Sequence, residues 1–139
     1  MKRFFALLFL LTNCVASEME PVYYFKGTHF VASYCDCNSS SLTNIDGLKE
    51  AMLAAVENCG ATLLNHCHYV FPPDGFSMVI LLSESHASIH TYPEHGSCFV
   101  DLFTCGEKCS SEAFDAVLRD YLQPKSVNSQ MLQRDRDIR

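Results

Sequence analysis

The stretch from Leu81 to Gly106 constrains this chain more than any other part of its 139 residues. It begins in an apolar run, turns around Pro93, and enters a second apolar run that leads to Cys105. Serines, histidines, carboxylates and cysteines are interleaved with the strand-forming residues. A segment that only filled a core would not need so many reactive groups. The stretch therefore indicates strands that also carry a reactive site.

The pattern along the whole chain predicts an α+β fold. Apolar, aromatic and β-branched residues predict strands at 27–34, 61–71, 76–83, 85–91 and 97–104, with a short edge strand at 126–132. Apolar residues at helical spacing predict helices at 45–58 and 111–122. This order of elements is typical of a two-layer sandwich, in which two helices cover one face of a mostly antiparallel sheet.

Local signals set the ends of several elements. Asn44 can cap the start of the first helix and Gly60 can end it. The serine-rich residues 35–43 are expected to form a loop, and residues 72–75, Pro-Pro-Asp-Gly, form a strong turn signal. The unbroken apolar run at residues 78–82 predicts a strand that is buried on both faces.

Composition excludes some classes of function. The net charge of −6 and the lack of a basic patch argue against a nucleic-acid partner. The eight cysteines match no zinc-finger or zinc-ribbon spacing, so we expect mostly free, buried thiols. A metal-binding module remains an alternative, because His66, His68, His86, His90 and His95 could supply ligands together with cysteines.

The first 18 residues are treated apart from the fold. Lys2-Arg3, the apolar run at 4–11 and the small residues at 15–17 resemble a secretory signal. The alternative is that Met19 is the true start and that the preceding segment is an extension. Residues 19–139 are expected to form a single domain. A functional signal would indicate an exported, inactive protein. A start at Met19 would indicate a cytoplasmic enzyme.

The pair Glu84-Ser85 is open to a specific reaction. A serine hydroxyl can attack the carbonyl that precedes it and convert the peptide bond into an ester. If a base then removes the serine Cα proton, the ester is eliminated to dehydroalanine, which loses ammonia and becomes a pyruvoyl group. Such a ketone can capture an amine and act as an electron sink. By itself, a serine after a glutamate does not indicate this chemistry.

The context of Ser85 is more specific. Residues 83–96 contain Ser-Glu-Ser-His and Ile-His-Thr-x-Pro-Glu-x-Gly, and residues 100–106 read Val-Asp-Leu-Phe-Thr-Cys-Gly. Both segments closely resemble the prokaryotic S-adenosylmethionine decarboxylase proenzyme, which is pyruvoyl-dependent. Gly27-Thr28-His29 and Gly60-Ala61-Thr62 are also similar to that family, so that the resemblance covers roughly residues 27 to 122.

The resemblance implies roles for individual residues. The cut would fall between Glu84 and Ser85 and leave a β chain ending at Glu84 and an α chain of residues 85–139. Ser85 would become the covalent pyruvoyl cofactor that forms a Schiff base with the substrate. His90 would be the proton acceptor in processing, Cys105 the proton donor in catalysis, and Ser77 a supporting group in processing. No metal is implied.

The resemblance also suggests a substrate and an assembly. Phe71 and Tyr92 would contact the adenine or the sulfonium of S-adenosyl-L-methionine, and Glu94 would face the sulfonium charge or a ribose hydroxyl. The expected product is the aminopropyl donor for spermidine biosynthesis, and the expected assembly is a homodimer of processed protomers with facing sheets. A pyruvoyl-dependent decarboxylase of ornithine or arginine is the close alternative.

The spacing of Ser85 and His90 conflicts with a direct contact between them in a regular strand. Ser85 and His90 are five residues apart, so that an ideal strand places their side chains on opposite faces. We therefore expect a bend, a bulge or the cut itself to bring them together.

Overall fold

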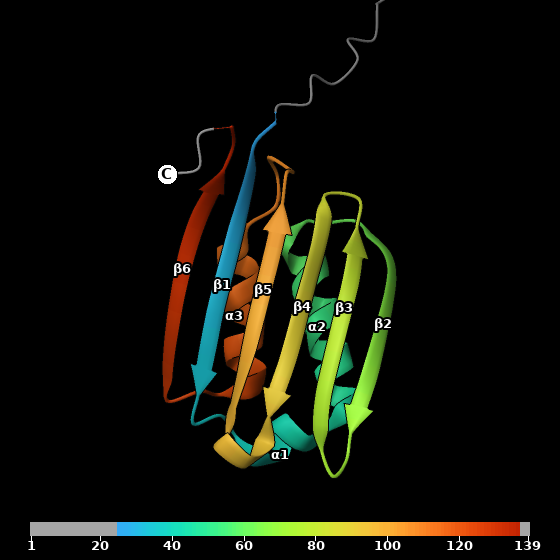
Figure 1. Ribbon diagram of the computed structural model, residues 1–139, viewed down its shortest axis with the longest axis vertical. Helices are drawn as coiled ribbons and strands as arrows, with labels where there is room; N and C mark the ends of the chain where they lie inside the picture. The colour runs from blue at the N-terminus through green and yellow to red at the C-terminus, as the bar shows by residue number, and fades with distance from the viewer. Residues whose placement is uncertain (1–24, 137–139) are drawn as a thin grey trace, which may run out of the picture.

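One sheet of six antiparallel strands organises the protein, whose computed structural model describes residues 25–136. The strand order is β2-β3-β4-β5-β1-β6, and the helices cover one face (Figure 1). The strands are β1 (Gly27–Cys35), β2 (Leu63–Phe71), β3 (Gly75–Leu82), β4 (Ser85–Tyr92), β5 (Ser97–Thr104) and β6 (Ser126–Arg134). The α+β sandwich predicted from the sequence is confirmed.

The two long helices form where the sequence predicts them. They are α2 (Ile45–Cys59) and α3 (Ser111–Leu122). The Asn44 side chain accepts the Gly47 N–H at 3.1 Å, and Gly60 ends α2 in the left-handed conformation with φ 83°. The predicted loop at 35–43 is wrong in part, because it contains the short helix α1 (Ser39–Thr43), whose first turn is capped by the Asn38 side chain.

The core lies between the helices and one face of the sheet. Every second residue of β3 faces it, and Met78, Ile80 and Leu82 are almost fully buried. The prediction that this strand is buried on both faces is wrong, since Val79 and Leu81 are 48% and 53% exposed. The run is apolar on both sides, but helices cover only one face of this sheet.

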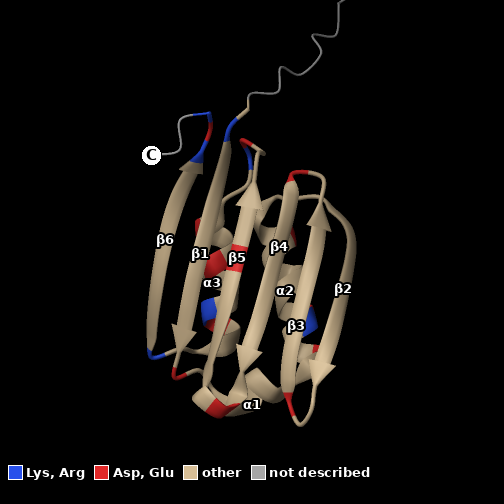
Figure 2. Cartoon of the chain, viewed as in Figure 1, with Lys and Arg blue, Asp and Glu red and all other residues tan. Residues whose placement is uncertain are grey.

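The face of the sheet opposite the helices is apolar and uncovered. Among the residues of the six strands, the only Lys, Arg, Asp or Glu are Asp101 in β5 and Arg134 at the end of β6, so the strands are almost free of charge (Figure 2). This open face carries exposed large side chains from all parts of the sheet, namely Tyr69, Phe71, Val79, Leu81, Phe99 and Leu132.

The connections between strands matter for the site. Strands β3 and β4 form a hairpin whose turn consists of Ser83 and Glu84, and Leu82 pairs with Ser85. Strand β1 is inserted between β5 and β6, although these two strands come from the C-terminal part of the chain. Helix α2, from the N-terminal half, packs against helix α3, from the C-terminal part (Figure 1).

The signal-like N-terminal segment lies outside the described residues, so its two readings stay predictions. Within residues 25–136, no helix is both long enough and apolar enough to cross a membrane. The seven cysteines of that range are free thiols, as predicted. The expectation that they are mostly buried is wrong, because only Cys59 and Cys98 are buried while Cys67 and Cys105 are exposed.

Candidate active site

The Glu84–Ser85 peptide bond lies where the tight β3–β4 turn meets the first residue of β4. Ser85 adopts φ 149°, a region that residues with a side chain rarely occupy. Such a conformation costs about 1–3 kcal/mol and persists only where the surroundings impose it. The Ser85 Oγ lies 3.1 Å from Nδ1 of His86. The backbone is therefore strained directly after the peptide bond at which the resemblance predicts cleavage.

The carbonyl of Glu84 receives two hydrogen bonds from one residue. The backbone N–H of Cys105 donates to this oxygen at 3.0 Å, and the Cys105 thiol donates to it at 3.1 Å. Both donors come from the residue directly after β5, which is the neighbour of β4 in the sheet. Donors fixed on a carbonyl oxygen stabilise the negative charge that develops there when a nucleophile attacks the carbon.

The side chain of Glu84 is also held on both sides. Its carboxylate accepts two hydrogen bonds from Thr62, which precedes β2: one from the N–H at 2.8 Å and one from Oγ1 at 3.1 Å. On the other side is Gly106, where a Cβ atom would lie only 2.7 Å from Cγ of Glu84. Glu84 and Cys105 line one open cleft at this end of the sheet together with Thr62, Gly106 and Cys109.

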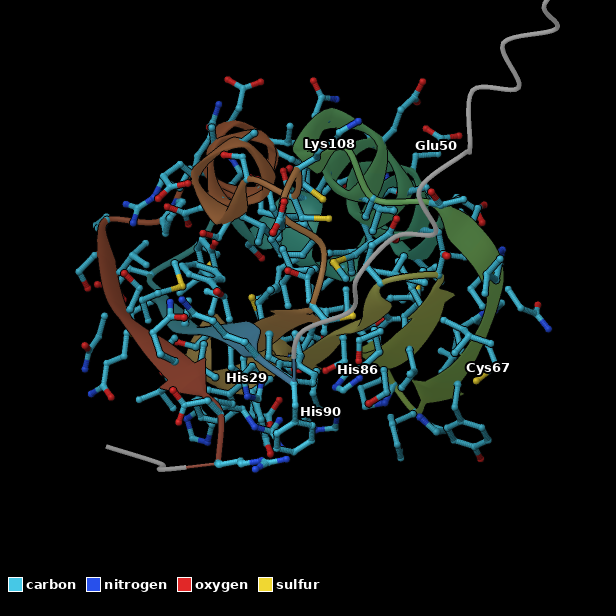
Figure 3. All side chains as sticks on the ribbon, turned by 90° about the horizontal axis from the view of Figure 1, so that it is seen from above. His29, Glu50, Cys67, His86, His90 and Lys108 are labelled. Atoms are coloured by element: carbon cyan, nitrogen blue, oxygen red, sulfur yellow. The ribbon has the colours of Figure 1, made fainter. Side chains whose placement is uncertain are left out.

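A second group of predicted residues gathers around His90 on the open face. The Ser77 Oγ and Nδ1 of His90 form a short hydrogen bond between neighbouring positions of β3 and β4. The His90 ring lies 5.7 Å from the ring of Phe71 and 4.7 Å from that of Tyr92. Figure 3 shows His90 on the side of the sheet that faces away from the helices. These four predicted residues are therefore brought together.

The structure separates this group from the Glu84–Ser85 bond. Strand β4 pairs continuously with both neighbours from Ser85 to His90, so that it contains no bulge. Five residues of antiparallel strand span about 17 Å, whereas proton transfer needs about 3 Å. The expectation that a bend or a bulge brings Ser85 and His90 together is therefore wrong, and the effect of the cut itself stays a prediction.

Glu94 lies beyond Tyr92 in the short 3-10 helix η1 (Pro93–His95), where its side chain is exposed. It therefore sits at the end of β4 that is distant from Ser85 and nearer to His90. The site residues named from the sequence fall into two sets: Glu84, Ser85 and Cys105 at one end of the sheet, and Ser77, His90, Phe71, Tyr92 and Glu94 towards the other.

Sequence reasoning missed a polar cluster at the centre of the open face. Asp101 lies 3.5 Å from Nε2 of His29 and 3.9 Å from Nε2 of His86, and it accepts a short hydrogen bond from Ser88. The ring of Phe103 packs against both imidazoles, at 5.4 and 5.7 Å. The signal was available, because Asp101 is the one charge inside an otherwise apolar strand.

A second thiol lies in the same cleft as Cys105 but in a different environment. Burial, followed by the neighbouring Cys59 and Glu84, raises the pKa of Cys109 to about 11. A thiol with such a pKa stays protonated near neutral pH and is a poor nucleophile. Cys105 is exposed and donates to the Glu84 carbonyl, so it is the thiol in this cleft that contacts the predicted cleavage position.

Comparison with known proteins decides the family. Residues 28–135 match the family described as S-adenosylmethionine decarboxylase. The chain belongs to this family. The S-adenosylmethionine decarboxylase match covers β1, both long helices, the hairpin and the C-terminal strand, and thus both groups of candidate residues.

Individual relatives agree with the S-adenosylmethionine decarboxylase assignment. The S-adenosylmethionine decarboxylase proenzyme of Thermosipho melanesiensis is 39% identical over 102 residues, which cover 73% of this chain and 78% of the relative. That of Methanococcus aeolicus is 40% identical over 98 residues, or 70% and 84% of the two chains. The crystal structure of the adenosylmethionine decarboxylase from Aquifex aeolicus superposes with a TM-score of 0.73 at 30% identity, covering 84% of this chain and 94% of that one.

The alternative functions gain no support from these findings. The relatives described above are named for S-adenosylmethionine, not for ornithine or arginine. Among the described residues, no three His, Cys, Asp or Glu side chains are arranged to hold a metal ion, so that the metal-binding alternative lacks a site there.

Proposed function

We propose that this protein is a self-cleaving, pyruvoyl-dependent decarboxylase of S-adenosyl-L-methionine. The observation that carries the proposal is the Glu84 carbonyl, which receives two hydrogen bonds from Cys105 directly before the strained Ser85. This arrangement favours attack on that carbonyl. Membership in the S-adenosylmethionine decarboxylase family supports the substrate.

The cleavage uses groups of the chain itself. Oγ of Ser85 attacks the carbonyl carbon of Glu84, and the two Cys105 donors stabilise the negative oxygen. The C–N bond then breaks, its nitrogen takes up a proton, and an ester links the two residues. A base removes the Ser85 Cα proton, so that the Glu84 carboxylate leaves and a dehydroalanine remains. Water adds to the dehydroalanine after tautomerisation, ammonia leaves, and residue 85 keeps a ketone.

Residues of both sets would serve such a group at position 85. The pyruvoyl ketone would capture the substrate amine and accept the electron pair that remains when carbon dioxide is lost. Cys105 lies at the cut and can donate a proton to the substrate carbon. The rings of Phe71 and Tyr92 lie beside His90 and would contact a sulfonium or an adenine, and Glu94 would add a negative charge for the same cation.

We infer that a second protomer completes this site. His90 is the base expected for elimination, yet about 17 Å of strand separates it from Ser85 in the same chain. The uncovered apolar face can pack on a second copy of itself, since apolar faces of this kind mark interfaces. A two-fold axis that lies in this interface and crosses the strands would place the Ser85 end of one sheet over the His90 region of the other.

Intact-mass spectrometry of the purified protein tests the proposed function. We expect a β chain that ends at Glu84 and an α chain that is lighter than the peptide 85–139 by one ammonia. Edman degradation of this α chain should yield no first residue, because a ketone replaces its amine. The Ser85→Ala variant is the matched control and should remain one chain. A single uncut chain in the wild type would refute self-cleavage.

The substrate is tested separately by release of labelled carbon dioxide. We expect release from carboxyl-labelled S-adenosyl-L-methionine and little from ornithine or arginine. The Phe71→Ala variant should raise the KM for S-adenosyl-L-methionine by about 3- to 30-fold if it loses one cation–π contact. Faster release from ornithine or arginine would replace the proposed substrate while leaving the cleavage chemistry intact.

A further inference from the structure

We propose that Thr62 is a positioning residue for self-cleavage, which holds the Glu84 side chain so that the carbonyl of Glu84 faces its two donors. The inference rests on the proposed cut between Glu84 and Ser85 and deepens it. Thr62 lies outside the residues to which the sequence assigned a role, and it touches none of the reacting atoms in this structure; it acts through Glu84.

Three hydrogen bonds connect Thr62 to the turn that carries the cut. Its N–H donates to Oε2 of Glu84 at 2.8 Å, and its hydroxyl donates to Oε1 at 3.1 Å. Its carbonyl accepts the N–H of Ser83 at 2.9 Å. One residue thus engages both oxygens of the Glu84 carboxylate and also the backbone next to it, a two-point contact that fixes orientation as well as position.

The opposite side of Glu84 is closed by Gly106. A Cβ atom at position 106 would lie 2.7 Å from Cγ and 3.3 Å from Cβ of Glu84. The side chain of Glu84 therefore passes between Thr62 and a residue that leaves room for it. Gly106 directly follows Cys105, whose N–H and thiol hold the Glu84 carbonyl. The carboxylate and the carbonyl of one residue are thereby fixed by two different segments.

The strain at Ser85 explains why this clamp matters for cleavage. Ser85 is held at φ 149°, a conformation that residues with a side chain rarely adopt and that persists only where the surroundings impose it. A residue kept in such a region relaxes if its neighbour is free to turn. When Thr62 no longer grips the Glu84 carboxylate, the peptide between Glu84 and Ser85 can rotate, and the Glu84 carbonyl loses its alignment with Cys105. The acyl shift should then become slower.

The experiment measures the rate of self-cleavage in Thr62 variants. Thr62→Val keeps the shape and the N–H but removes the hydroxyl, and Thr62→Ser restores a hydroxyl. We expect Thr62→Val to slow cleavage of freshly translated protein by about tenfold, because a hydrogen bond to a charged group is lost, and Thr62→Ser to recover most of the rate. Gly106→Ala is a second variant, which displaces Glu84 from the other side and should also slow cleavage.

Two controls separate positioning from a general loss of structure. The melting temperature of each variant is compared in the Ser85→Ala background, where every protein is uncut. Hydroxylamine, which cleaves esters, is added to the cleavable proteins. A His90→Ala protein stalls after the ester has formed, so that hydroxylamine should release its two chains. Thr62→Val stalls before the ester and should gain nothing from hydroxylamine.

The outcomes distinguish this inference from the proposed function. If the wild type is cut and Thr62→Val is cut at the same rate, the inference is overturned while the proposed function stands. Slow cleavage that matches a lowered melting temperature, or that hydroxylamine rescues, also overturns it. If the wild type itself is never cut, both fall. Slow cleavage with an unchanged melting temperature, insensitive to hydroxylamine and restored by Thr62→Ser, supports it.

Discussion

The position of His90 leads to a prediction about two subunits. A His90→Ala chain keeps its own Ser85, and a Ser85→Ala chain keeps its own His90. If the site is built across a dimer, the Ser85 of a His90→Ala chain depends on the His90 of its partner. It lacks this base only when the partner is another His90→Ala chain. Paired with the Ser85→Ala chain, it meets an intact His90 and should be cut.

The distance between Ser85 and His90 within one chain determines how strongly the His90→Ala substitution should affect cleavage. Within one chain, Ser85 and His90 are separated by five residues of regular strand, or about 17 Å, and a base acts only at about 3 Å. Loss of a general base typically slows a reaction by about 10²- to 10⁴-fold. The His90→Ala protein alone should therefore stay uncut over times in which the wild type is processed completely.

Co-expression of the two variants with different tags provides the assay. If subunits pair at random, about half of the His90→Ala chains enter mixed dimers, and about half should be cut. Tandem purification by both tags should isolate mixed dimers in which nearly all of these chains are cut. A chain that carries both substitutions is the control partner, since it can pair but offers no His90.

A cis arrangement would give a different result. If His90→Ala chains remain uncut beside Ser85→Ala chains although mixed dimers are recovered, His90 acts within its own chain. The need for a base from the partner chain would then no longer support a dimer with facing sheets. Equal cutting with the doubly substituted partner would show that some other base serves the elimination.

Three further outcomes follow from single residues. Cys105→Ala keeps its N–H on the Glu84 carbonyl but loses the thiol, so we expect cleavage on gels to slow by about tenfold and carbon dioxide release to fall by about 10²- to 10⁴-fold. Iodoacetamide should label exposed Cys105 before buried Cys98, as peptide mass mapping can show, because the hydrogen bond with Cys37 and burial raise the pKa of the Cys98 thiol. Burial and its hydrogen bond to an aspartate raise the pKa of Tyr34, so this tyrosine stabilises the fold fully below pH about 10, the value of an unfolded tyrosine. Above it, the free energy of unfolding should fall by about 1.4 kcal/mol per pH unit, and denaturant titrations of Tyr34→Phe should lack that component.

Most of the fold could be predicted because local signals and periodicity agree with it. Caps at Asn44 and Gly60 fix α2, and alternating residues fix the strands. The run at residues 78–82 was misjudged for a physical reason: Val79 and Leu81 face outwards and are apolar. A sequence does not distinguish a side chain buried in its own core from one on an uncovered apolar face.

The site was less accessible to sequence reasoning than the fold. The residues themselves could be named from the motifs, since both segments are long and specific. Their distances could not, because the pairing register of β4 decides that Ser85 and His90 stay apart. Thr62 was missed because its contact with Glu84 joins residues 22 positions apart through a hydrogen bond that no motif encodes.

The insertion of β1 between β5 and β6 gives the proposed cut a lasting consequence. The fragment before the cut would contain β1 and α2, and the fragment after it would contain β5, β6 and α3, so the two pieces are interleaved in the sheet and in the helical layer. They would not part without disrupting several ladders at once. Once separated, however, they would have to find each other by diffusion, and refolding would become second order in concentration. The lifetime of the mature molecule would then be set by slow unfolding. The uncut chain can fold again on its own, whereas the two separated fragments would first have to associate.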